Sequence, residues 1–173
     1  MHSEPAWSTF TVAGDTLHRR GAIVPMVVVM ADGNGVDFPT EITTRIAPTA
    51  GERYHVSADP AQRALAGLSM GSGQTLSTLW AHPGAFAYIG AMSAFGVPPE
   101  GTDIDAVNAG TALIRVYSGD RQDFTYVPTL HLIAAMEDRG VVHEFAPVIP
   151  GPHGWDVWQR SLIDLLPRLF TSA

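Results

Sequence analysis

Residues 63–79 read RALAGLSMGSGQTLSTL, and this stretch predicts the fold of the chain. A short apolar run leads into the pattern G-x-S-x-G at residues 67–71, and a segment with helical character follows. A strand, this pattern and a helix in succession are typical of a nucleophile elbow, a strained turn that exposes a serine hydroxyl. We therefore expect Ser69 to be a nucleophile and the N–H of Met70, at the start of the helix, to stabilise charge on a substrate. We also expect strand and helix to approach too closely for a Cβ at either glycine of the pattern.

Composition limits the class of protein. The chain has 173 residues, 46% of them hydrophobic, so we expect a single domain over residues 1–173. The net charge of −7 at pH 7 argues against a nucleic-acid partner, and the absence of cysteine excludes a thiol nucleophile. No apolar run approaches the roughly 18 residues that a membrane span needs, and the N-terminus lacks the parts of a signal peptide. We expect a cytoplasmic chain, secreted if its natural start lies elsewhere, with a small-molecule substrate and no metal, cofactor or membrane partner.

Apolar runs alternate with segments of helical character along the whole chain. The expected strands are residues 25–30 (PMVVVM, the clearest of them), 64–68, 86–92, 112–117 and 144–149, and the expected helices are 16–22, 38–47, the one after Ser69, 128–139 and 161–170. Residues 98–110 are expected to form a loop. This alternation predicts an α/β fold with a mostly parallel sheet of about five strands and helices on both faces.

A serine nucleophile needs a base, and the base needs an orienting acid. In the order typical of α/β folds with this elbow, the acid and then the histidine follow the serine. His153 lies in the loop PGPHGW after the last expected strand, where the carboxyl end of a strand would bring it to the serine. His131 lies inside an expected helix and His143 at the start of an expected strand, and both are interpreted as structural. Asp120 and Asp123 both lie in the loop after the 112–117 strand, and their spacing does not choose between them.

Three segments carry a resemblance to a known family: GLSMGSGQTL at 67–76, AHPGAFAYIGAMSAFG at 81–96 and GVVHEFAPVIPGPHGWDVWQRSL at 140–162. Together they resemble the feruloyl-esterase and esterase D branch of the α/β hydrolases, which includes enterochelin-esterase-like enzymes. The resemblance implies Ser69 as nucleophile and His153 as base. Aligned on Asp123-Phe124, it implies Asp123 as the acid, with Asp120 in reserve. Trp155, in the H-x-W-x-x-W pattern, is a candidate for substrate binding.

The chain departs from the family in one respect. Members carry an H-G-x-G loop that supplies a second oxyanion donor, and here no such loop precedes PMVVVM. The missing strand would lie between the 25–30 and 64–68 strands. We expect either that these two strands pair directly, that a second copy of the chain covers the edge, or that the chain is a shortened form.

These observations predict a serine ester hydrolase that forms an acyl-enzyme on small or aromatic-acyl esters, with reduced turnover. The alternatives are a non-catalytic or weakly active hydrolase-like binding protein, a siderophore-ester hydrolase and an acyltransferase that uses the same triad.

Overall fold

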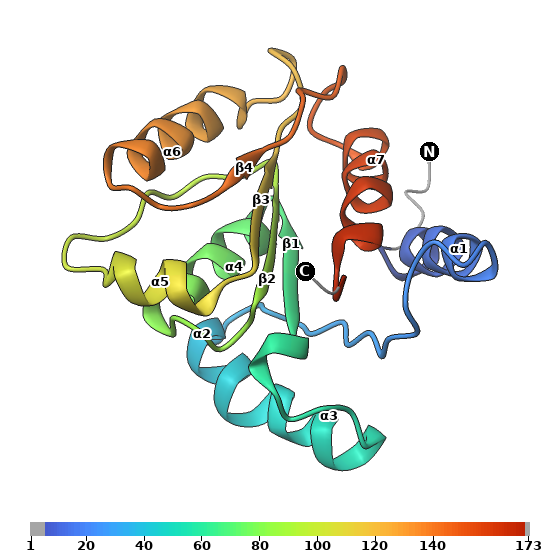
Figure 1. Ribbon diagram of the computed structural model, residues 1–173. Coiled ribbons are helices and arrows are strands. Elements are labelled where there is room, and N and C mark those ends of the chain that lie inside the picture. Colours follow the sequence, from blue (N-terminus) through green and yellow to red (C-terminus); the bar gives the residue numbers. More distant parts are fainter. Residues whose placement is uncertain (1–5, 172–173) are drawn as a thin grey trace.

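The computed structural model describes residues 6–171, and its centre is a parallel sheet of four strands (Figure 1). The strands are β1 (Ala64–Leu68), β2 (Tyr88–Met92), β3 (Leu113–Tyr117) and β4 (Glu144–Phe145), and their spatial order is β1-β2-β3-β4. Every neighbouring pair is parallel, so all carboxyl ends lie at the same edge of the sheet. The expected α/β class with a mostly parallel sheet is confirmed, with four strands instead of five.

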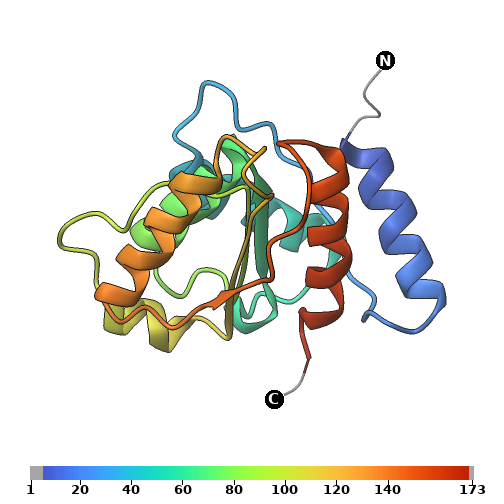
Figure 2. The same ribbon diagram turned by 90° about the horizontal axis from the view of Figure 1, so that it is seen from above.

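Helices cover both faces of the sheet (Figure 2). On one face lie α4 (Met70–Ala81), α5 (Ile104–Gly110) and α6 (Tyr126–Asp138). On the other face lies α7 (Trp155–Leu165), and α1 (Ala6–Arg19) packs on the outside of α7. Before β1 the chain forms α2 (Phe38–Glu41), the π-helical turn η1 (Ile42–Ile46), α3 (Ala47–Tyr54) and the 3₁₀ turn η2 (Pro60–Gln62). After α7 it forms a second 3₁₀ turn, η3 (Leu166–Arg168).

The two layers of the core are set by alternation along the strands. Ile89 and Val116 face α4 and α6, whereas Tyr88 and Tyr117 face α7. Both sets are buried, so β2 and β3 are largely apolar and show no regular polar alternation. Arg115 in β3 is the exception, and its guanidinium is ion-paired. Gly90, in the middle of β2, lets α7 pack closely, because a Cβ there would lie 2.3 Å from Leu165 Cδ2.

The prediction that residues 25–30 form a strand is wrong. This segment crosses from α1 to α2 as an extended trace with no strand partner among residues 6–171 (Figure 1). Val27, Val29 and Met30 are about half exposed, at 48%, 48% and 51%. A β-branched run has the propensity for a strand, but a strand also needs a neighbour for its N–H and C=O groups, and none lies beside this one.

The same observation corrects the expectation about the sheet edge. The outer edge of β1 is unpaired within the described residues, because β1 pairs with β2 alone, and a cleft separates it from residues 24–34. Direct pairing of the 25–30 segment with β1 is therefore ruled out in this structure. Coverage of the edge by a second copy stays a prediction.

Several element boundaries differ from expectation. Pro48 does not end a helix: it lies in the first turn of α3, and the helical region runs without a break from Phe38 through η1 to Tyr54. The expected 98–110 loop contains α5, capped by the Asp103 carboxylate, which accepts a hydrogen bond from Ala106 N at 3.0 Å. The last helix begins at Trp155, six residues earlier than expected. No helix in the described part of the chain is long and apolar enough to cross a membrane.

Candidate active site

The turn between β1 and α4 holds Ser69 in a strained conformation. Its φ of 51° and ψ of −120° lie in a region that costs a non-glycine residue about 1–3 kcal/mol. The turn is fixed on both sides, since Ser69 N donates to Met92 O at 2.9 Å and Ser69 O accepts from Ser72 N at 2.9 Å. Ser69 therefore lies at the carboxyl end of β1, on the turn predicted from the sequence.

The two glycines of the elbow pattern play different parts. A Cβ on Gly67 would lie 2.1 Å from the carbonyl oxygen of Gly71, so the expected close approach is confirmed there. At Gly71 the expectation is wrong, because an added Cβ would meet no atom within 4 Å outside its own helix. Gly67 thus contacts the backbone of residue 71, and this contact does not require a glycine at position 71.

The structure brings three of the predicted residues into one hydrogen-bonded chain. His153 Nε2 lies 2.8 Å from Ser69 Oγ, and His153 Nδ1 lies 2.9 Å from Asp123 Oδ1. The ionised carboxylate can only accept, so the ring carries its proton on Nδ1 and leaves Nε2 free to accept from the serine hydroxyl. Asp120 lies elsewhere: its carboxylate accepts from Gln122 N at 2.9 Å and Gly151 N at 3.1 Å, and so holds the two loops of the site together.

Asp123 is buried and saturated with donors. Its Oδ1 also accepts from Thr125 N at 2.9 Å and Thr125 Oγ1 at 2.7 Å, and its Oδ2 accepts from Ser93 Oγ at 2.7 Å. Burial alone would raise the pKa of Asp123, but the hydrogen bonds from Thr125, Ser93 and His153 outweigh it and hold that pKa below its usual value. The group therefore stays a carboxylate at neutral pH.

Aromatic side chains enclose the imidazole of His153. The Phe124 ring lies over it with a centroid distance of 4.1 Å, and Trp158 meets it edge to face at 5.0 Å. Ser93, Thr125 and Trp158 had no assigned polar role in the sequence interpretation, although Ser93 and Trp158 belong to quoted motifs. An Asp-x-Thr turn at 123–125 was the available signal for Thr125.

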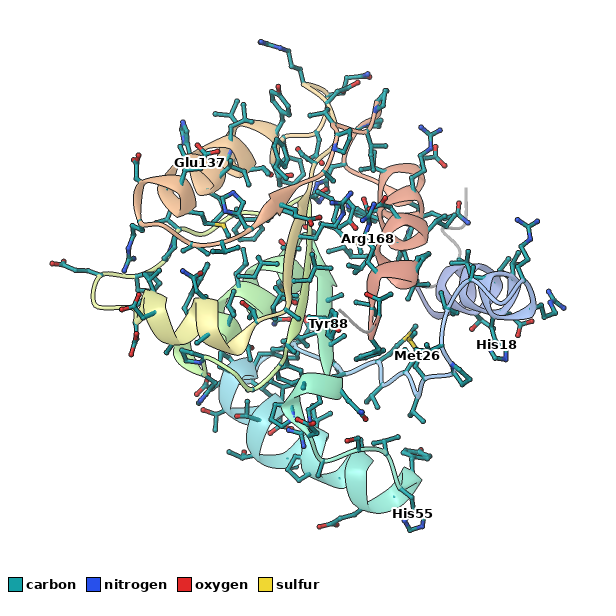
Figure 3. The ribbon with its side chains drawn as sticks, in the orientation of Figure 1. His18, Met26, His55, Tyr88, Glu137 and Arg168 are labelled. Atoms are coloured by element: carbon teal, nitrogen blue, oxygen red, sulfur yellow. The ribbon has the colours of Figure 1, made fainter. Side chains whose placement is uncertain are left out.

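Four other histidines in the described part of the chain stand apart from these hydrogen bonds. His18 lies on α1 and His55 at the far end of α3, away from the carboxyl edge of the sheet (Figure 3). His143 Nδ1 lies 2.8 Å from Val141 O, a local contact, and His131 is exposed on α6.

A cleft of about 1330 Å³ opens beside Ser69. Its walls include residues 24–34, the free edge of β1, the start of α4 and the length of α7. Met70 and Trp155 both line it, Trp155 being half-buried. Gln74 closes one end, because its Nε2 donates to Gly33 O at 2.8 Å and ties the 31–35 loop to α4. The Met70 N–H, at the first residue of α4, is a candidate oxyanion donor.

A parallel sheet with an elbow serine, a histidine and a carboxylate at its carboxyl edge has the architecture of an α/β hydrolase. The chain belongs to the putative esterase family, whose model matches residues 4–169. It is 31% identical over 185 residues to an endo-1,4-beta-xylanase/feruloyl esterase of Xylanibacter ruminicola, an alignment that covers 97% of this chain and 25% of that protein. The chain thus spans about a quarter of the length of this curated relative.

Solved structures agree with the family. A ferulic acid esterase superposes with a TM-score of 0.75 at 25% identity, over 97% of this chain and 80% of that one. A ferulic acid esterase from Anaeromyces mucronatus gives 0.72 at 16% identity, over 90% and 69%. An enterobactin esterase from Shigella flexneri gives 0.70 at 19% identity, over 90% and 46%. The last two structures establish the shared fold alone. Together with the family match, the similar proteins confirm the predicted resemblance to this group of esterases.

Proposed function

We propose that this chain hydrolyses carboxylic esters, with Ser69 as nucleophile, His153 as general base and acid, and Asp123 as the orienting carboxylate. The observation that carries the proposal is the unbroken hydrogen-bonded chain from Asp123 through His153 to Ser69. The two neighbours of Ser69 in sequence, Leu68 and Met70, line the cleft. Membership of the putative esterase family supports the same reaction class.

In the first step Ser69 Oγ attacks the ester carbonyl carbon while His153 Nε2 accepts the hydroxyl proton. The imidazolium that forms is stabilised by the Asp123 carboxylate at 2.9 Å. The carbonyl oxygen becomes an oxyanion, and the Met70 N–H at the positive end of α4 is placed to donate to it.

In the second step the tetrahedral intermediate collapses and the C–O bond to the alcohol breaks. His153 returns its proton to the leaving alcohol, and the acyl group stays on Ser69 as an ester. Water then enters, His153 removes its proton, and the same sequence releases the carboxylic acid and restores the Ser69 hydroxyl.

The lining of the cleft supports small or aromatic acyl groups as substrates. Trp155 and Met70 are apolar surfaces beside Ser69, and Trp155 meets Trp158 edge to face at 5.2 Å, which fixes its ring. Aromatic rings in such an arrangement favour an aromatic acyl group. The names of the feruloyl and ferulic acid esterases among the similar proteins point the same way.

A second candidate function is a binding protein with slow turnover. It is favoured by the edge of β1, which residues 24–30 leave unpaired across the cleft. The strand expected at this edge, and the H-G-x-G loop that supplies the family's second oxyanion donor, have no counterpart in the described part of this chain. Loss of one such donor costs about 10²–10³ in turnover. Such a chain would be acylated but would release its product slowly.

The test combines a fluorophosphonate probe with hydrolysis of p-nitrophenyl acetate and methyl ferulate. We expect wild type to be labelled once, and Ser69→Ala and His153→Ala to lose labelling. Ser77→Ala, an exposed serine on α4, is the matched control and should keep it. Labelling that persists in Ser69→Ala would refute the assignment. Labelling with turnover far below the ~10 s⁻¹ typical of enzymes would favour the second candidate.

A further inference from the structure

We propose that Ser93 and Trp158 are positioning residues for the proposed reaction: the Trp158 indole orients the Ser93 hydroxyl, and this hydroxyl locks the Asp123 carboxylate against His153. The inference rests on the proposed function for its catalytic meaning. Its contacts, however, are tested separately below. Two residues outside the Ser-His-Asp set thereby gain a defined role.

Ser93 is held rigidly between two strands. It follows β2 directly, is fully buried, and has a φ of 50°, a left-handed conformation that is costly for a serine. Its N–H donates to Tyr117 O at 3.0 Å, at the end of β3, so the residue cannot relax without disturbing both strands. The strained backbone points the Ser93 hydroxyl at Asp123 Oδ2, 2.7 Å away.

The direction of each hydrogen bond follows from the donors available. An indole nitrogen can only donate, so Trp158 Nε1, 2.9 Å from Ser93 Oγ, must give its hydrogen to the serine oxygen. The single hydroxyl hydrogen of Ser93 is then directed to the carboxylate, which can only accept. The order Trp158 to Ser93 to Asp123 is therefore fixed by chemistry.

This order determines which carboxylate oxygen meets the histidine. Oδ2 is occupied by Ser93, and Oδ1 is left for His153 Nδ1 and for Thr125. Trp158 acts twice, because its ring also contacts the imidazole edge to face at 5.0 Å. One side chain on α7 thus sets the histidine ring directly and the carboxylate through Ser93.

Removal of the Ser93 hydroxyl should change the basicity of His153. Without this donor the Asp123 carboxylate carries more charge toward the imidazole, which favours the imidazolium, so the His153 titration should move to higher pH. The charged group in contact with this ring is Asp123. Asp120 acts only indirectly, because its carboxylate repels that of Asp123. The Phe124 and Trp158 rings are neutral.

The experiment measures the His153 titration by NMR of imidazole-labelled protein, with the resonance assigned by its loss in His153→Asn. We expect an upward shift in Ser93→Ala and a smaller shift in the same direction in Trp158→Phe, which keeps a ring but removes the N–H. Ser161→Ala is the control, because Ser161 is also fully buried and its hydroxyl donates within α7 to Val157 O. It should leave the titration unchanged.

Kinetics supply a second readout where wild type hydrolyses esters. The acid limb of the kcat/KM profile should shift upward in Ser93→Ala, with kcat lowered about 10- to 100-fold, the loss of one charge-assisted hydrogen bond, and KM little changed. A lowered unfolding midpoint with an unchanged His153 titration would show that Ser93 is structural only and overturn the proposal. If Ser93→Ala fails to fold, Trp158→Phe decides by the same titration. Failure of wild type to react with any ester would refute the proposed function and leave the titration test intact.

Discussion

Replacement of Gly67 by alanine should damage the elbow more than replacement of Gly71. A Cβ at Gly67 would lie 2.1 Å from Gly71 O and 2.3 Å from Gly71 C, whereas real Cβ contacts are essentially never shorter than 3.0 Å. The start of α4 must therefore move away from β1 by about 0.9 Å. Both partners are backbone, so no side chain can rotate to absorb the shift.

The magnitude follows from the displacement. Overpacking typically costs about 1–3 kcal/mol, and we expect Gly67→Ala at the upper end because the contact is with a fixed peptide. Gly71→Ala meets no atom beyond its own helix and should gain up to about 1 kcal/mol from helix propensity. The two variants should thus differ by about 3–4 kcal/mol, or roughly 6–16 °C in Tm for a chain of this size.

Thermal and urea unfolding followed by circular dichroism measure this difference directly. The rate of fluorophosphonate labelling, at a temperature where both variants are folded, gives the second readout. A displacement of about 1 Å at a reacting group can cost 10²-fold, so Gly67→Ala should be labelled far more slowly than wild type. Equal stability of Gly67→Ala and Gly71→Ala would refute the argument that strand and helix are in backbone contact at this turn.

Three further predictions follow from the carboxylates and from the α7 face of the sheet. Asp123→Asn should lower kcat/KM about 10²–10⁴-fold, because the imidazolium loses its counter-charge, while Asp120→Asn should have a small effect. The reverse ranking in a p-nitrophenyl ester assay would move the role of acid to Asp120. The pKa values of Asp123 and Asp164 are lowered in the fold, so their contribution to stability is complete above the unfolded value of 3.8 and is lost as pH falls through the folded values. Urea midpoints measured from pH 6 to pH 2.5 should therefore decline most below about pH 4. An invariant midpoint would contradict this. Arg115 is buried between Asp164, at 2.7 Å, and Glu144. Arg115→Met should destabilise the chain by only about 1–2 kcal/mol, because both carboxylates are partly exposed and keep water as a substitute partner. A more stable variant in the same unfolding assay would show that desolvation of the guanidinium outweighs its ion pairs.

Elements whose signals are local could be predicted from the amino-acid sequence. The elbow at Ser69, its helix and the strands β2 and β3 are set by apolar runs and turn residues a few positions apart, and the structure has them where they were expected. The expected 144–149 strand is shorter, because β4 covers only Glu144–Phe145. His153 could be singled out for a similar reason, because a loop that follows a parallel strand begins at the carboxyl edge of the sheet. In these cases short-range sequence and fold agree.

Features that depend on partners distant in sequence become visible only in the folded chain. Residues 25–30 have the composition of a strand, yet no strand lies beside them among residues 6–171, and hydrogen bonding across a sheet cannot be read from one strand. Asp120 and Asp123 have equivalent local signals, and only the packing of the two loops brings Asp123 to His153 while Asp120 ties those loops together. The orientation of Ser93 likewise requires contacts from β3 and α7, because a side-chain hydrogen bond is fixed by three-dimensional distance and not by separation along the chain.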